Sequence, residues 1–156
     1  MPDLHHRYQV RTTWTGNTGQ GTAAYTSYQR SHEISAPHKN PILGTTVVPK
    51  FNDATRYNPE ELLVAALSAC HMMWLLHLCA DAGITVVSYV DDATGKMKMG
   101  GQTERFSEVT LHPVMKITDP SRIQDAEALH EQAHKFCSLA ASVNFPVHCQ
   151  PSVTAD

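Results

Sequence analysis

Two of the four cysteines, Cys70 and Cys137, are the side chains in this sequence best suited to redox chemistry. A thiolate attacks a peroxide oxygen and becomes a sulfenic acid, and a second thiol then condenses with that acid to form a disulfide. Both cysteines lie on segments predicted to be helices that pack together around the core, so their thiols can approach each other. A reactive pair of this kind is the minimum equipment of a thiol peroxidase.

A second interpretation of these cysteines stays open, because buried single cysteines commonly act as small apolar side chains. A thiol in the middle of a helix gains nothing from the helix N-terminus, so ionisation of Cys70 requires a nearby cation, Arg or His. His71, adjacent in the sequence, is a weak candidate for that role. His71 and His77 are otherwise expected to satisfy hydrogen bonds in the core.

The other cysteines and histidines give little support for a metal site. Cys79 and Cys149 form no CxxC pair, so we expect neither to have a chemical role. His130 and His134 are spaced i, i+4 on a predicted helix and can present two imidazoles to one metal ion. An exposed helical face explains that spacing equally well, so we expect no metal and no other cofactor.

The longest apolar segment must position Cys70. Asn58 is a good N-cap for a helix, Glu61 can reach back to it as in a capping box, and Gly83 supplies the C-terminal stop. Nearly every residue over 62–80 is apolar, which indicates a helix of about 36 Å that is buried all round. A compact chain of this length has a radius of gyration of only about 15 Å, so such a helix favours an oligomer.

The N-terminal part is predicted to be a β-hairpin over residues 7–34, with one buried face on its first strand. Its turn, 16–21, spells GxxGxG, but no buried strand precedes it and no helix follows, so a hairpin loop is favoured over a dinucleotide site. Residues 35–57 contain three prolines and no sustained period, which indicates a long irregular connection.

Four further elements are predicted after Gly83: strands over 84–97 and 106–117, a second helix over 119–140, and a short final strand beginning at 144. A turn near Gly100-Gly101 separates the two strands, and Pro113 indicates an edge or a bulge. Apolar residues of the second helix recur at three and four, which places Cys137 on its buried stripe. The order β-β-loop-α-β-β-α-β predicts the α+β class.

Length and composition exclude several classes of protein. The 156 residues favour a single domain over 1–156, and a net charge of −3 offers no footprint for nucleic acid or an anionic membrane. Ser68, His71 and His77 interrupt the apolar helix, so we expect no membrane span. Met1–Arg7 resembles no secretory signal, so we expect a cytoplasmic protein. Only 17% of residues are charged, which hints at surface buried against another subunit.

The segment from Asn58 to Cys70 strongly resembles the OsmC/Ohr superfamily, the osmotically inducible and organic-hydroperoxide-resistance proteins. In that family an Asn-Pro-Glu motif carries a Glu ten residues ahead of the peroxidatic cysteine, and Glu60 and Cys70 keep this spacing. The second family cysteine lies in the later helix, as Cys137 does. The stretch 142–147 looks like a distinct OsmC-like branch. The resemblance implies an antiparallel sheet packed on long central helices in an intertwined homodimer.

This resemblance implies a dithiol peroxidase that reduces organic or lipid hydroperoxides to alcohols. Cys70 would be peroxidatic, Cys137 would be resolving, and Glu60 would hold an arginine that stabilises the thiolate. The implied reductant is a dithiol such as a lipoylated protein, and the implied active sites lie at the subunit interface. Glu60 and Cys70 are about 15 Å apart along a straight helix, so they meet only if the helix bends or one comes from the partner chain.

The chain departs from the family pattern in ways that leave its arginine unassigned. Proline does not follow Cys137, and the two positions that carry the family arginine hold Lys50 and Gln20. Arg56, just before the Asn-Pro-Glu motif, and Arg30, on the second strand, are the available substitutes. Lysine lacks the planar fork that can hold a carboxylate and a thiolate together. The alternative function is a non-catalytic or redox-sensing dimer that binds an apolar ligand in the same pocket.

Overall fold

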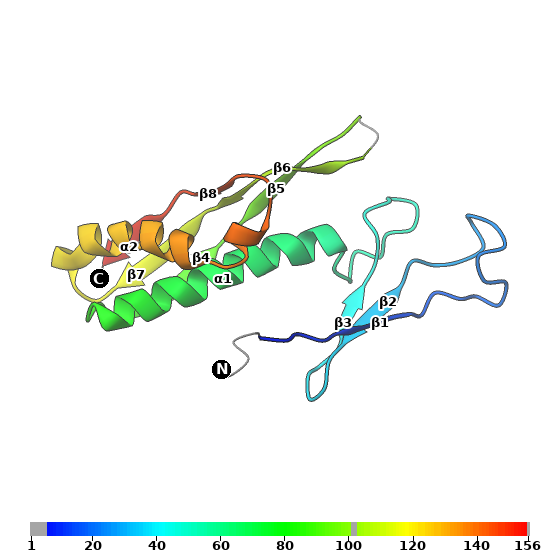
Figure 1. Cartoon of the computed structure of the whole chain (residues 1–156), viewed down its shortest axis with the longest axis horizontal. Helices are drawn as coiled ribbons and strands as arrows, with labels where there is room; N and C mark the ends of the chain where they lie inside the picture. Colours follow the sequence, from blue (N-terminus) through cyan, green and yellow to red (C-terminus); the bar gives the residue numbers. More distant parts are fainter. Residues whose placement is uncertain (1–5, 101–102, 156) are drawn as a thin grey trace, which may run out of the picture. The chain divides into compact units, whose positions relative to one another are not determined.

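The structure is a computed structural model that describes residues 6–100 and 103–155 (Figure 1). Two compact units make up the chain, Met1–Leu62 and Leu63–Asp156, and each is described by itself. The α+β class is confirmed by two α-helices and three small β-sheets. The single domain over 1–156 stays a prediction. The predicted turn at Gly100-Gly101 lies partly outside the described residues.

The first unit holds an antiparallel sheet in the order β1-β2-β3, formed by Arg11–Trp14, His32–Ser35 and Ile42–Gly44. The predicted hairpin is confirmed by the pairing of β1 with β2. Its glycine-rich turn is also confirmed as a loop, because the Asn17 Oδ1 atom accepts the N–H groups of Gly19 and Gly21. Both glycines have positive φ angles, 111° and 55°, which other residues rarely adopt.

Two predictions for this unit are wrong. The first strand has no buried face, since every residue of β1 is exposed. The indole N–H of Trp14, its last residue, donates a hydrogen bond to the Gln29 carbonyl. The connection over 35–57 is not wholly irregular, because it contains β3. Gly44 allows β3 to pair with β2, because the His32 ring lies against its Cα and leaves no room for a Cβ.

Helix α1, Pro59–Asp81, begins and ends where the sequence predicts. The capping box is confirmed: the Asn58 Oδ1 atom accepts the Glu61 N–H at 2.8 Å, and the Glu61 carboxylate accepts the Asn58 N–H at 3.0 Å. Gly83, with φ of 70°, follows the last turn. Together these local contacts satisfy backbone groups that a helix end otherwise leaves unpaired.

The second unit pairs its strands into two three-stranded sheets. One has the order β4-β7-β9 and the other β5-β6-β8, with these strands: Val86–Asp91, Pro113–Ile117, Ser152–Ala155, Thr94–Lys98, Arg105–Leu111 and Val147–Cys149. Each predicted long strand is therefore broken in two, near 92 and at 112. The sheets are mixed, because β8 and β9 join in parallel. β7 is central, so Pro113 marks a strand start rather than an edge.

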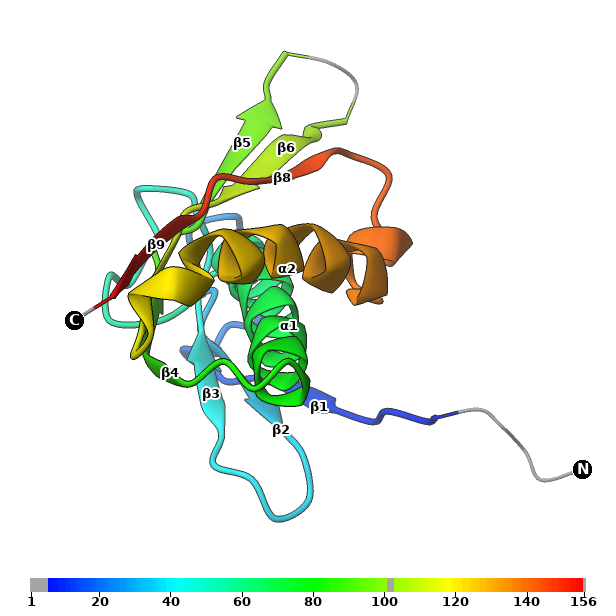
Figure 2. The ribbon, with the colours of Figure 1, turned by 90° about the vertical axis from the view of Figure 1, so that its left-hand side faces the viewer.

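The second predicted helix is shorter than its apolar stripe. A 3₁₀ turn at Pro120–Arg122 leads into α2, Ile123–Phe136, and another 3₁₀ turn follows at Ala140–Ser142. Cys137 is the first residue beyond α2, with an extended ψ of 102°, so its predicted place within the helix is wrong. In both views α2 lies against α1 (Figures 1 and 2), and the Trp74 and Phe136 rings are 5.2 Å apart.

Helix α1 is not buried all round in the single chain. Its buried residues are Leu67, Cys70, His71, Leu75 and Cys79. The core of the second unit forms where these meet the sheets and α2, with Met115, Ile117 and Ala133 fully buried. Among the described residues α1 alone is long and apolar enough to span a bilayer, and five of its residues are buried within the single chain.

Candidate redox site

The structure brings the Cys70 and Cys137 thiols together inside the second unit. Cys70 is 8% exposed and Cys137 is 2% exposed, and both are free thiols. The two side chains lie close enough for Cys70 to affect the protonation of Cys137. α1 supplies the first cysteine from its middle, and the end of α2 supplies the second.

The surroundings of Cys137 keep it protonated. Burial and the neighbouring Cys70 side chain raise the pKa of Cys137 to about 11, although the Ala140 N–H, 3.4 Å from its Sγ atom, acts in the opposite direction. At neutral pH Cys137 therefore holds its proton and can donate it to the neighbouring sulfur.

Asp91 anchors the helical turn that carries Cys70. Its Oδ2 atom accepts the Ser68 hydroxyl at 2.5 Å, and its Oδ1 atom accepts the His112 N–H at 2.7 Å. His112 is the residue that separates β6 from β7, so its N–H needs a partner outside the regular ladder. The Asp91 carboxylate thus connects the break between β6 and β7 to α1 at Ser68, two residues before Cys70.

The remaining predicted site residues lie in the first unit, and the structure does not join them. Glu60 has one buried carboxylate oxygen without a hydrogen-bond partner among the described residues. Arg56 pairs with Asp53 at 3.0 Å. The Arg30 guanidinium donates to the Tyr28 and Tyr25 carbonyls and lies 3.6 to 4.4 Å from three aromatic ring centres. The roles of Glu60 and of both arginines stay predictions.

A cluster that the sequence analysis missed lies beside the thiol pair: His71, His130 and Cys149. The His71 Nε2 atom is 3.0 Å from the His130 Nδ1 atom, and the Cys149 Sγ atom is 3.6 Å and 3.8 Å from these two nitrogens. Both imidazoles are almost fully buried, at 1% and 2% exposed. Burial lowers the pKa of His130 to about 4 and that of His71 below its usual value, so both rings are neutral at pH 7.

These contacts decide several predictions about the histidines. His71 makes a core hydrogen bond, as expected. His77 does not, because it is exposed and faces Asp81 at 3.4 Å. The His130 Nδ1 atom faces His71 on α1 and Cys149 on β8. The spacing within one helix could not reveal this, since the partners lie on other elements.

A cavity of about 450 Å³ opens beside this cluster. His130 and Cys149 form part of its wall, together with Glu127, Glu131 and His134. This cavity therefore leads to two of the three clustered side chains.

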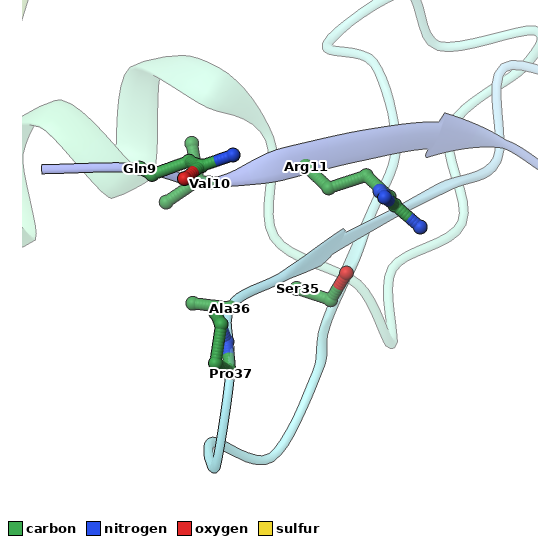
Figure 3. A pocket seen from close by; sticks show the side chains of 6 residues that line it. All are labelled: Gln9, Val10, Arg11, Ser35, Ala36 and Pro37. Carbon is green, nitrogen blue, oxygen red and sulfur yellow. The ribbon is translucent and has the colours of Figure 1, made fainter.

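A different cavity, of about 360 Å³, lies in the first unit at the ends of β1 and β2. Figure 3 shows the Arg11 guanidinium and the Ser35 hydroxyl pointing in the same direction along the strands, away from Pro37. None of the predicted site residues lines this cavity, so it is not a candidate for the redox site.

Solved structures share this fold over nearly the whole chain. An OsmC-like protein of unknown function from Vibrio cholerae is 26% identical, with a TM-score of 0.85 over 95% of this chain and 100% of the other. An organic hydroperoxide resistance protein from Elizabethkingia anophelis is 20% identical, with a TM-score of 0.65 over 98% and 100%. A further Vibrio cholerae protein, described as a putative organic hydroperoxide resistance protein with captopril in one active site, is 21% identical, with a TM-score of 0.61 over 97% and 94%.

No functionally curated protein matches the sequence. A family model does: the model described as OsmC-like protein matches residues 52–152, which include both members of the buried thiol pair and all three members of the neighbouring cluster. The chain belongs to the OsmC-like family.

Proposed function

We propose that this protein is a thiol-dependent peroxidase that reduces organic hydroperoxides to alcohols. The observation that carries the proposal is the buried contact between Cys70 and Cys137, two free thiols on separate elements of one unit. The fold is shared with proteins described as organic hydroperoxide resistance proteins, which supports the same class of reaction.

In the proposed reaction the Cys70 thiolate attacks the terminal oxygen of the hydroperoxide, and the O–O bond breaks. The alkoxide leaves and takes a proton to become the alcohol, while Cys70 becomes a sulfenic acid. The Cys137 sulfur then attacks the Cys70 sulfur, the S–O bond breaks, and the hydroxyl departs as water with the proton from Cys137. One hydroperoxide and two thiols give one alcohol, one disulfide and one water.

A dithiol reductant completes the cycle by thiol–disulfide exchange. It attacks the Cys70–Cys137 disulfide, forms a mixed disulfide, and leaves as its own intramolecular disulfide with both protein thiols restored. We propose a lipoyl-type dithiol, carried on a protein, for this role.

Apolar side chains around the thiol pair favour organic over hydrogen peroxide. On α1, Leu67 and Trp74 lie within about one helical turn of Cys70. Leu139, two residues after Cys137, is 40% exposed and offers apolar surface close to the pair. An alkyl or aryl group on the peroxide gains free energy by leaving water for such a surface, and hydrogen peroxide has no such group.

We further propose that a second copy of the chain covers α1. Five exposed apolar residues recur every three or four positions and so share one face of the helix: Ala65, Ala69, Met73, Leu76 and Ala80. The side chain of Met73, in the middle of this face, is 62% exposed. A dimer also resolves the separation of about 15 Å between Glu60 and Cys70 on one straight helix, because the partner can supply one of them.

A turnover assay tests the proposal. Dihydrolipoamide and cumene hydroperoxide are mixed with the protein, and dithiol consumption is followed. We expect catalysis by the wild-type protein, loss of catalysis in Cys70→Ser and in Cys137→Ser, and wild-type rates in Cys79→Ser. Cys79 is the matched control because it is another buried cysteine on α1. Equal rates for Cys70→Ser and wild type contradict the proposal.

A redox-sensing dimer is the second candidate function. The partners of Arg30 and Arg56 favour it, because each guanidinium is held by groups other than Glu60 among the described residues. A sensor oxidises once per chain and then stops. Stoichiometric thiol oxidation without turnover on added dithiol therefore selects this function over the peroxidase.

A further inference from the structure

We propose that His71, His130 and Cys149 form a binding site for a Zn²⁺ ion. The site is distinct from the proposed redox pair, and the inference does not depend on the proposed peroxidase activity. α1, α2 and β8 contribute one ligand each, and the three donor atoms lie within 4.8 Å of one another. Two imidazoles and a thiolate suit zinc, whereas magnesium and calcium take oxygen ligands.

The distances between the donor atoms fit the ion. With zinc–nitrogen bonds of about 2.05 Å and a zinc–sulfur bond of about 2.3 Å at the tetrahedral angle, two nitrogens lie about 3.3 Å apart and each lies about 3.6 Å from the sulfur. The corresponding distances in the structure are 3.0 Å, 3.6 Å and 3.8 Å. The spacing of the three atoms is therefore within about 0.3 Å of three corners of a zinc tetrahedron.

Buried polar atoms around the cluster lack partners, which is unusual in a folded core. The His71 Nδ1 atom, the His130 Nε2 atom and the nearby Tyr89 hydroxyl have no hydrogen bond among the described residues. Burying several polar side chains together costs free energy, and the single hydrogen bond between His71 and His130 offsets only part of that cost. An ion in the cluster would bond the inward-facing His71 Nε2, His130 Nδ1 and Cys149 Sγ atoms, while the unpaired His71 Nδ1 and His130 Nε2 atoms lie on the opposite side of each ring.

The adjoining cavity gives the ion its route and its fourth ligand. His130 and Cys149 line the cavity of about 450 Å³, and the Glu127 and Glu131 carboxylates in its wall attract a cation. Three protein ligands leave one position open, which a water from the cavity fills. Cys149 binds as a thiolate, so its proton is released to solvent when the ion enters.

Calorimetric titration tests the site. Chelator-treated protein is titrated with Zn²⁺, Mg²⁺ and Cu⁺; we expect saturation at one Zn²⁺ per chain and no Mg²⁺ binding. Cys149→Ala and His130→Ala should each weaken Zn²⁺ binding at least about tenfold. Cys79→Ala and His77→Ala are the matched controls and should bind as the wild type does. Cys70→Ser should also bind normally, which separates this site from the thiol pair.

Cobalt substitution gives a second readout that does not depend on the folding of a histidine variant. Co²⁺ in the wild-type protein should show thiolate-to-cobalt charge transfer that persists in Cys70→Ser and disappears in Cys149→Ala. Absence of that band, absence of saturable Zn²⁺ binding, or binding that survives Cys149→Ala and is lost in Cys70→Ser overturns the proposal. Binding of Cu⁺ alone by the same residues overturns the assignment to zinc.

Discussion

At the scale of single residues, the two thiols of the pair have different proposed roles. Cys137 is buried beyond the end of α2 with a pKa of about 11, so less than about one thiol in a thousand is ionised at pH 7. The reactive form of a cysteine is the thiolate. Cys137 therefore acts second, after Cys70 has become an electrophilic sulfenic acid.

The pH dependence of alkylation tests this difference. The reduced protein is pulsed with iodoacetamide across about pH 7 to 10, and labelled peptides are quantified by mass spectrometry. Below its pKa, the thiolate fraction of Cys137 rises about tenfold per pH unit, so we expect its labelling rate to rise through the whole range. A plateau for Cys137 below about pH 9 contradicts the raised pKa.

Local residue patterns predicted some features of the site and missed others. The Asn58–Glu61 capping box was predictable because both partners lie in one helical turn. The approach of Cys70 to Cys137 was expected from two helices that share a core, although Cys137 lies just beyond the end of α2. The contact of His71 with Cys149 was not predictable, because periodicity shows which helix face is buried and not which polar side chains meet there.

At the scale of elements, one carboxylate connects α1 to the sheets. Asp91, the last residue of β4, accepts from Ser68 on α1 and from the His112 N–H between β6 and β7. The sequence analysis predicted unbroken strands over 84–97 and 106–117. It could not show the breaks, since a side chain from another strand satisfies the backbone group that leaves the ladder.

Asp91→Ala tests the importance of this connection. The substitution leaves the partly buried His112 N–H unpaired, so we expect the free energy of unfolding to fall by about 2 kcal/mol. Urea denaturation measures the change. Asp92→Ala is the matched control, because Asp92 is the exposed neighbour, and should change stability by less than about 0.5 kcal/mol. Equal effects of the two substitutions contradict the role given to Asp91.

At the scale of the whole molecule, α1 exposes more apolar surface than a core helix of a monomer does. The sequence predicted a helix buried all round, and the single chain buries only five of its residues. The sequence indicated correctly that the helix is apolar. It could not show which face of the helix packs within the chain and which face stays exposed. The proposed second copy would cover the apolar face that the single chain leaves exposed.

Met73→Lys tests the proposed dimer. A lysine in the middle of an apolar interface is costly to bury, so we expect the variant to sediment as a monomer while the wild type sediments as a dimer. Met99→Lys is the matched control, since Met99 is equally exposed, at 65%, but lies outside α1. A monomeric wild type, or a dimeric Met73→Lys protein, contradicts the proposal.

The central claim is that Cys70 and Cys137 act as one redox pair, and peptide mapping after oxidation tests it most directly. Reduced protein receives one equivalent of cumene hydroperoxide, and its free thiols are counted before digestion under acidic conditions. The account predicts the loss of two of the four thiols and one new disulfide, joining Cys70 to Cys137. Unchanged thiols, or a disulfide that involves Cys79 or Cys149 instead, would contradict it.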